Sequence, residues 1–203
     1  MYKNYPKTGT VLALTIFSFA NAQKGTYLVL GSVGFYSQKV NSSGNHATQN
    51  NFVIAPKIGY QFAENWTVGV QTSASFTKNE TDSGNGKSDY YGIGAFVRYS
   101  KPLSEIFEVY ADLGSGYNFG SGSYTNNNNT TVNTNDSNGF GVSITPALLI
   151  KIKNGFGLNF GFGGLGYYSN KSTYQDNPNA SQKTKNFEFN FGQTFTAGIS
   201  KNF

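Results

Sequence analysis

The sequence predicts an all-β fold, an eight-stranded antiparallel up-and-down β-barrel, and three observations support this prediction. The chain of 203 residues contains 25 Gly, 18 Phe and 14 Tyr but only 12% charged residues, a composition that favours strands over helices. Eight segments alternate between apolar residues and polar or small ones with the period of a strand. The connections between them are alternately short and long, which is typical of strands that run up and down around a barrel.

The eight alternating segments span residues 25–38, 51–62, 66–77, 90–100, 107–119, 140–152, 156–168 and 187–203. In chain order, their apolar faces run from Tyr27 to Phe35, Phe52 to Phe62, Trp66 to Phe76, Tyr91 to Tyr99, Phe107 to Phe119, Phe140 to Ile152, Phe156 to Phe162 and Phe187 to Phe203. The first segment alternates least regularly. The positions between the apolar ones hold mostly Gly, Asn, Thr, Ser, Gln or a charged residue, so each strand has one apolar face.

Three short connections agree with this assignment of faces. Residues 63–65, 101–105 and 153–155 are expected to be turns, whereas the polar segments 41–50, 79–87, 125–138 and 173–184 are expected to be long loops. The short turns place Phe62 opposite Trp66, Tyr99 opposite Phe107 with Arg98 opposite Glu108, and Ile152 opposite Phe156. Gly155 suits the left-handed position that a three-residue turn requires. In each case the turn pairs residues of the same face.

The first 22 residues have the three-part pattern of a signal peptide. Lys3 and Lys7 precede an apolar run at residues 11–20, and Ala20-Asn21-Ala22 supplies the small residues of a signal-peptidase site. The run is too short to cross a bilayer as a helix, and the sequence contains no window of 18 or more apolar residues. We therefore expect residues 1–22 to be a signal peptide and residues 23–203 to form the barrel domain.

Composition excludes several kinds of site. The absence of cysteine excludes disulfides, thiolate metal sites and a cysteine nucleophile. A single histidine, His46, leaves no multi-histidine metal site. The net charge of +5 comes from scattered residues without a basic stripe, so we expect no nucleic-acid partner. The stretch from Gly161 to Gly166 matches the dinucleotide pattern G-x-G-x-x-G, but it lies in a strand pattern and opens no helix. We expect no cofactor and no metal.

Aromatic residues gather at both ends of the apolar face. At the short-turn end these are Phe62, Trp66, Tyr99, Phe107, Phe156 and Phe203; at the long-loop end they are Phe35, Phe52, Phe76, Tyr91, Tyr117 and Phe140. Ten steps of ~3.3 Å, tilted by roughly 40°, separate two such ends by about 25 Å. This height matches the apolar band of a transmembrane barrel with an aromatic girdle at each interface. The apolar face is therefore predicted to face lipid.

Residues 25–203, with a last strand that carries Phe195, Ala197, Ile199 and the terminal Phe203, resemble the small eight-stranded outer-membrane barrels, the OmpA/OmpX-like or porin-family proteins. The resemblance implies a multi-pass protein of the cell outer membrane, with short periplasmic turns and long extracellular loops. It also implies contact with outer-membrane lipid and lipopolysaccharide, recognition of the last strand by the barrel-insertion machinery, and a monomer.

The face opposite the apolar one carries three cations and three anions: Lys57, Arg98, Lys151, Glu108, Asp112 and Glu188. A small barrel is just wide enough for its own side chains, and buried charges must be paired. The favoured interpretation is a structural ionic plug in the lumen. The alternative is a narrow gated ion path past the plug, because inward glycines such as Gly59, Gly69, Gly92 and Gly114 leave room for long polar side chains or for water.

The long polar connections suggest two roles. They are either solvated surface or a contact surface for another cell, a host molecule or lipopolysaccharide sugars. Lysines near this end either meet lipopolysaccharide phosphates or only solvate the rim; they are Lys39, Lys78, Lys87, Lys171, Lys183 and Lys185.

One group of loop residues resembles a catalytic site. His46 with Asp82-Ser83 resembles the surface residues of outer-membrane lipid A palmitoyltransferases, in which histidine would be the base for a serine hydroxyl. That family begins with an amphipathic helix, which the first strand here leaves no room for, and Asp-Ser-Gly is an ordinary turn sequence. We therefore predict a non-enzymatic outer-membrane barrel with a structural role in the envelope or a surface interaction. The alternatives are a small passive channel and, third, a lipid A-modifying acyltransferase.

Overall fold

The computed structural model describes residues 25–42, 45–128, 130–174, 177–192 and 195–203. The predicted signal peptide lies outside these residues. Within them, the helical structure is a single 3-10 turn, Lys153–Gly155. The described residues thus contain no helix that is long and apolar enough to cross a membrane.

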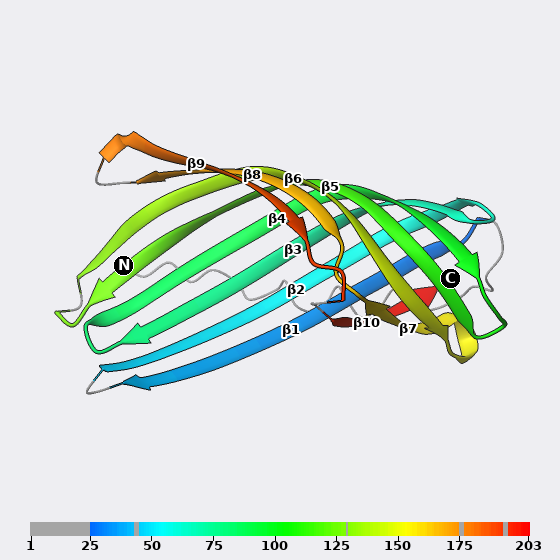
Figure 1. The fold of residues 1–203 in the computed structure, drawn as a ribbon, viewed down its shortest axis with the longest axis horizontal. Coiled ribbons are helices and arrows are strands. Elements are labelled where there is room, and N and C mark those ends of the chain that lie inside the picture. Colours follow the sequence, from blue (N-terminus) through cyan, green and yellow to red (C-terminus); the bar gives the residue numbers. More distant parts are fainter. Residues whose placement is uncertain (1–24, 43–44, 129, 175–176, 193–194) are drawn as a thin grey trace, which may run out of the picture.

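The strands form one antiparallel sheet that closes on itself (Figure 1). They are β1 (Tyr27–Ser42), β2 (Asn45–Ala63), β3 (Trp66–Thr81), β4 (Gly84–Pro102), β5 (Phe107–Asn126), β6 (Thr131–Lys151), β7 (Phe156–Gly161), β8 (Leu165–Tyr174), β9 (Asn177–Phe189) and β10 (Thr196–Asn202). The segments β7 and β8 form the seventh strand of the barrel, and β9 and β10 form the eighth. Because β6 pairs with both β5 and β7, and β10 pairs with both β7 and β1, the predicted all-β, eight-stranded up-and-down barrel is confirmed.

The polar segments that were predicted as loops continue the strands instead. Ser42 pairs with Asn45, Thr81 with Gly84 and Thr125 with Thr131, so in three of the long connections the strands stay paired through most of the segment. Cross-strand hydrogen bonds between short polar side chains accompany the pairing, including Ser37 Oγ to Asn50 Oδ1 at 2.8 Å. Backbone pairing does not need apolar side chains, and alternation therefore underestimates strand length in water-facing hairpins.

The three short turns agree only partly with the predicted register. Ile150 pairs with Leu158, the register that also places Ile152 opposite Phe156, as predicted. The β4–β5 prediction is wrong by four residues, because β4 continues to Pro102, which pairs with Glu108; Arg98 therefore pairs with Asp112. At the β2–β3 turn a bulge pairs Trp66 with Ala63, but from Gln61 opposite Thr67 onward the two strands keep the predicted register. The displacement between β4 and β5 is an even number of residues, so it leaves every side chain there on its predicted face.

The seventh and eighth strands are each interrupted, which alternation did not predict. Gly163 has a φ of 84° and Gly192 a φ of 78°, conformations that favour glycine. The Gly164 amide donates to Asn190 Oδ1 at 2.8 Å, and the Asn190 amide donates to the Gly164 carbonyl at 3.1 Å. The glycine-rich stretch from Gly161 to Gly166 is thus the bend between β7 and β8.

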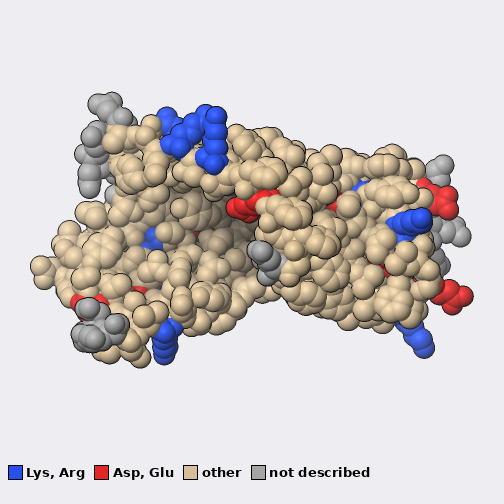
Figure 2. Space-filling view, in the orientation of Figure 1, with Lys and Arg blue, Asp and Glu red and all other residues tan. Residues whose placement is uncertain are grey.

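This bend separates β9 from β1. The pairing of β1 with the last strand ends at Gly31 opposite Ile199, and β9 pairs only with β8 among the described residues. Figure 1 shows β9 and β1 diverging toward the long-hairpin end, and Figure 2 shows a hollow between them. The barrel is therefore closed around its short-turn half, while a gap runs along its other half.

The apolar face points outward and the core lies inside the short-turn half. Large apolar side chains exposed on the outside include Val70 at 53%, Ile93 at 60% and Leu113 at 51%. The buried apolar side chains that fill the lumen are Leu28, Leu30, Phe96, Tyr110, Ala147 and Leu149. In the long-hairpin half the lumen is hollow, with one cavity of about 500 Å³ lined mostly by Ser, Asn and Tyr residues.

Candidate functional site in the barrel lumen

An ion pair between neighbouring strands lies at the centre of the lumen. Arg98 on β4 and Asp112 on β5 are paired in register and are 3% and 4% exposed. The Arg98 Nε and Nη2 atoms donate to the two carboxylate oxygens of Asp112 at 2.7 and 3.0 Å. This two-bond geometry holds both side chains in one orientation.

A second cation and an aromatic ring complete the centre. The Lys57 Nζ atom on β2 donates to Asp112 Oδ2 at 3.0 Å, so two cations share one carboxylate. The Phe96 ring, 1% exposed, lies 5.3 Å from Lys57 Nζ and 5.9 Å from Arg98 Cζ. A Cβ atom added at Gly59 or Gly69 would lie 3.1 or 2.7 Å from this ring. The space at these two glycines therefore holds an aromatic side chain, where a polar one was expected.

Hydrogen bonds extend the network to the opposite wall. The Arg98 guanidinium lies 3.6 Å from the centre of the Tyr110 ring, and the Tyr110 hydroxyl donates to Asn159 Oδ1 at 3.0 Å. The Asn159 Nδ2 atom donates to Ser200 Oγ at 2.8 Å. Side chains from β2, β4, β5, β7 and β10 thus form one connected network. Every buried side-chain nitrogen and oxygen atom of the described residues has a partner.

The other three predicted lumen charges lie apart from this network. Lys151 Nζ and Glu108 Oε2 form a separate pair at 2.7 Å, nearer the short-turn end and partly exposed. Glu188 lies on β9 and lines a cavity with Tyr168, Asn190 and Thr196. The structure brings Arg98 to Asp112, where the predicted register placed Arg98 opposite Glu108. Phe96, Tyr110 and Asn159 were not among the predicted site residues, although alternation placed Phe96 and Tyr110 on the inward face.

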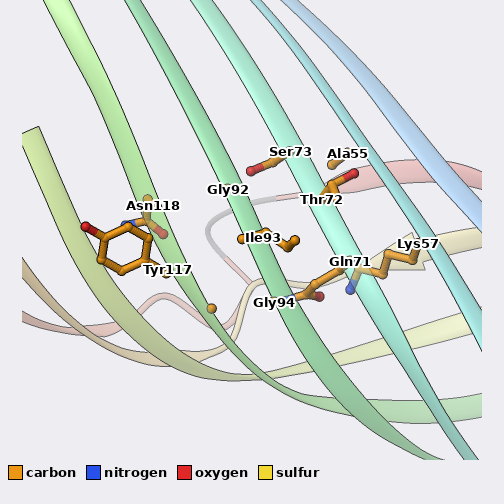
Figure 3. A pocket seen from close by; sticks show the side chains of 11 residues that line it. Ala55, Lys57, Gln71, Thr72, Ser73, Gly92, Ile93, Gly94, Tyr117 and Asn118 are labelled. Atoms are coloured by element: carbon orange, nitrogen blue, oxygen red, sulfur yellow. The ribbon is translucent and has the colours of Figure 1, made fainter.

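Above the network the lumen contains space lined by polar side chains. Lys57, Gln71, Ser73 and Asn118 line a cavity of about 200 Å³ (Figure 3). A Cβ atom added at Gly114 would lie 3.1 Å from Gln71 Nε2, so this glycine does leave room for a polar side chain. The Lys57 side chain, 23% exposed, forms part of the boundary between the filled and hollow halves.

Five of the six predicted girdle residues at the short-turn end are exposed. Phe62, Trp66, Tyr99, Phe107 and Phe156 are between 38% and 47% exposed. The Trp66 and Tyr99 rings are 4.9 Å apart, and the Tyr27–Tyr60 pair, which was not among the predicted girdle residues, adds to them at 5.4 Å.

Phe203 differs from the other five. It is only 7% exposed, and the Lys201 Nζ atom lies 4.6 Å from its ring centre. Its backbone pairs with Tyr27 across the seam that closes the barrel. The Phe203 side chain is therefore buried, whereas alternation alone assigned it to the lipid-facing girdle.

The residues proposed for a catalytic arrangement meet without forming one. The backbone amide of His46 donates to Asp82 Oδ2 at 2.7 Å, while the His46 ring bonds Asn41 through Nδ1. The Ser83 hydroxyl bonds the Thr81 hydroxyl at 3.1 Å. The carboxylate thus holds two neighbouring hairpins together, and the imidazole and the serine hydroxyl have other partners.

Comparisons with known proteins agree with this architecture. A family model described as the outer membrane protein beta-barrel domain matches residues 9–195. No curated protein matches the sequence. The structure resembles the outer membrane protein OprG from Pseudomonas aeruginosa with a TM-score of 0.50 and 13% identity, covering 88% of this chain and 96% of OprG. At this identity the likeness concerns the fold alone.

Two further solved structures are similar at lower scores. The translocator domain of the autotransporter NalP from Neisseria meningitidis has a TM-score of 0.48 and 16% identity over 88% of this chain, which spans 62% of that domain. Ail, the attachment invasion locus protein of Yersinia pestis, has a TM-score of 0.41 and 16% identity, covering 89% of this chain and 100% of Ail.

Proposed function

Because the chain belongs to the outer membrane protein beta-barrel domain family, and so is a protein of the outer membrane, we propose that it is a non-enzymatic scaffold whose lumen is plugged and whose long hairpins make contacts at the cell surface. Outer-membrane lipid and lipopolysaccharide surround the barrel. The last strand is the segment that the barrel-insertion machinery recognises, and the protein acts as a monomer.

The network around Arg98 and Asp112 carries the first half of the proposal. It joins five strands and buries both charged groups almost completely. An ion passing through this half of the lumen would have to break several charge-assisted bonds in a site from which water is largely excluded. This arrangement favours a plug over the passive channel that the sequence also allowed.

Planar-bilayer recording tests the plug. The wild-type protein is expected to give no step currents, whereas removal of the ring and the guanidinium together in Phe96→Ala/Arg98→Ala should open a water path. Step currents from the wild type would contradict the proposal, as would a double variant that stays silent although it is folded by gel mobility.

The hairpins carry the second half. β5 and β6 stay paired well beyond the aromatic girdle at the long-hairpin end, out to Thr125 and Thr131. They therefore hold polar side chains in a defined arrangement above the membrane. Rigid presentation reduces the ordering entropy that a mobile loop loses on binding. The four predicted loops are thus better described as short polar sheets that project from the barrel.

Shortening one hairpin in register tests the contact surface. Deleting residues 125–138 would leave Gly120 and its neighbours unpaired, whereas removing residues 120–137 keeps the pair of Phe119 and Asn138, which a two-residue Asn-Gly turn can join. Cell-to-cell aggregation and binding of lipopolysaccharide core sugars to the purified barrel should both fall.

The matched control removes residues 78–87 and keeps the pair of Thr77 and Ser88. It separates the contribution of the β5–β6 hairpin from that of the β3–β4 hairpin. If both shortened proteins fold and both retain all surface contacts, the hairpins are not the contact surface.

A further inference from the structure

The outward face of the β8–β9 hairpin changes from apolar to cationic within four rungs. Leu165 pairs with Phe189, Tyr167 with Phe187, Ser169 with Lys185 and Lys171 with Lys183. Two residues along a strand span about 6.6 Å, so the change occurs over a distance comparable to the boundary between acyl chains and headgroups. Phe187 and Phe189 are 71% and 72% exposed, and Figure 2 shows a group of lysines on this side of the molecule.

The lysines of this hairpin form an unbalanced cluster. Lys171 and Lys183 are directly opposite each other, an arrangement that destabilises an antiparallel pair. No salt bridge to either lysine or to Lys185 occurs among the described residues. On the outward face of the described residues, the neighbouring carboxylate is Asp136, opposite Thr173, whereas Glu188 of β9 lines an inner cavity. Among these outward groups, three cations outnumber one anion. An anion bound from outside would relieve this repulsion.

A second lysine pair on the barrel shows the contrast. Lys78 and Lys87 are also directly opposite each other, on β3 and β4. There Glu80 forms a salt bridge with Lys78 that lowers the pKa of the Glu80 carboxyl. The protein thus provides an internal counter-ion for one lysine pair and none within the described residues for the other.

The free edge of β9 adds hydrogen-bond donors beside the lysines. Among the strands that the structure describes, β9 pairs with β8 alone, and side chains 181–189 are all exposed. Alternate backbone N–H groups of an edge strand point away from its partner. A lipid at this edge therefore meets backbone donors that the described strands leave unpaired. The lysine side chains lie toward the tip of the hairpin and the phenylalanine rings toward the bend.

We propose that the outward face and free edge of the β8–β9 hairpin bind a phosphate-bearing lipid of the outer leaflet. Lys171, Lys183 and Lys185 hold the phosphate groups, and Phe187 and Phe189 contact the acyl chains. The inference rests on the proposed function, since it requires that the long-hairpin end lies at the outer leaflet. It assigns a specific lipid contact to one hairpin, with the lipid serving as counter-ion for lysines that have no salt bridge among the described residues.

The affinity of the folded, detergent-solubilised full-length chain for fluorescent bisphosphorylated lipid A, measured by anisotropy, tests the site. The triple variant Lys171→Gln/Lys183→Gln/Lys185→Gln should bind at least about tenfold more weakly, since each lysine near an anionic surface contributes about a fivefold factor in affinity. Phe187→Ser/Phe189→Ser should also weaken binding. The wild type should bind dephosphorylated lipid A as weakly as the triple lysine variant does.

The matched control is Lys39→Gln/Lys78→Gln/Lys87→Gln, which makes the same change in net charge elsewhere on the hairpins and should bind like the wild type. Equal losses in both triple variants would show general charge attraction and overturn the site. Efficient competition by inorganic phosphate would show a small-anion site and overturn the lipid assignment. Both shortened proteins keep the β8–β9 hairpin, and this assay measures lipid A binding instead of aggregation or core-sugar binding. Failure of the hairpin-shortening experiment and failure of the lipid site are therefore distinguishable.

Discussion

The Asp112 carboxylate accepts three bonds, two from Arg98 and one from Lys57. All three side chains lie inside the barrel, where each charge depends on its partners because little water reaches it. Arg98 also stacks on Tyr110 at 3.6 Å, so it contributes packing as well as charge. The stability of the lumen therefore depends strongly on this one arginine.

Arg98→Ala is expected to destabilise the barrel by about 3–5 kcal/mol, because it leaves the Asp112 carboxylate buried with one cation in place of two. Thermal unfolding in detergent should show a lower melting temperature, and Arg98→Lys should lie between the variant and the wild type, since lysine cannot form two parallel bonds. The exposed Lys101→Ala is the control. An unchanged melting temperature in Arg98→Ala would contradict the role of the ion pair.

The bend between β7 and β8 decides the course of the last two strands. At Gly163, φ is 84°, and an added Cβ atom would lie 2.2 Å from the Asn190 carbonyl oxygen. The left-handed backbone and the close contact both require glycine. Since Asn190 is bonded to Gly164, the same bend holds the end of β9 in place.

Gly163→Ala is expected to lower the free energy of unfolding by about 1–3 kcal/mol, the usual cost of a strained backbone position. The β8–β9 hairpin should be disturbed before the rest of the barrel. Limited proteolysis at increasing temperature should cut this hairpin first. Gly86→Ala is the matched control, because a Cβ atom there would lie 3.7 Å from Asn79 Cβ, an ordinary contact. Identical behaviour of the two variants would show that the bend does not require glycine.

At the scale of the whole molecule, a filled and closed half supports a hollow half with a lateral gap. In the closed half, the pairing of β1 with β10 completes the ring of strands. This half also contains nearly all of the buried side chains. A closed ring has no free edge from which strands can separate one at a time. Unfolding of this half should therefore be cooperative and slow in detergent.

Gel mobility of the outer-membrane fraction with and without boiling tests this expectation. The unheated protein should migrate differently from the boiled one, and the conversion temperature should fall in Arg98→Ala, which weakens the filled half. Detergent should be necessary to keep the folded protein in solution. Identical mobility before and after boiling, or a monodisperse protein in water without any amphiphile, would contradict the lipid-facing barrel.

Much of the barrel could be predicted from alternation, because side-chain direction repeats every two residues within a strand and needs no knowledge of distant contacts. The strand count, the outward apolar face and the exposed aromatic residues from Phe62 to Phe156 all depend on this local rule. The lumen charges were predicted as a set for the same reason. Their partners were not, since the pairing of Arg98 with Asp112 depends on where β4 ends, and turn composition left that open.

Sequence alone therefore determined which face of each strand meets lipid, because the pleat of a strand is a local property. Only the tertiary structure decided which charges touch, where the last two strands bend, that Phe203 is buried and how β9 separates from β1. These features depend on residues far apart in the chain, such as Gly163 and Asn190. A register shift by an even number of residues leaves the two-residue alternation of apolar and polar side chains unchanged. Alternation therefore cannot specify which residues pair across neighbouring strands.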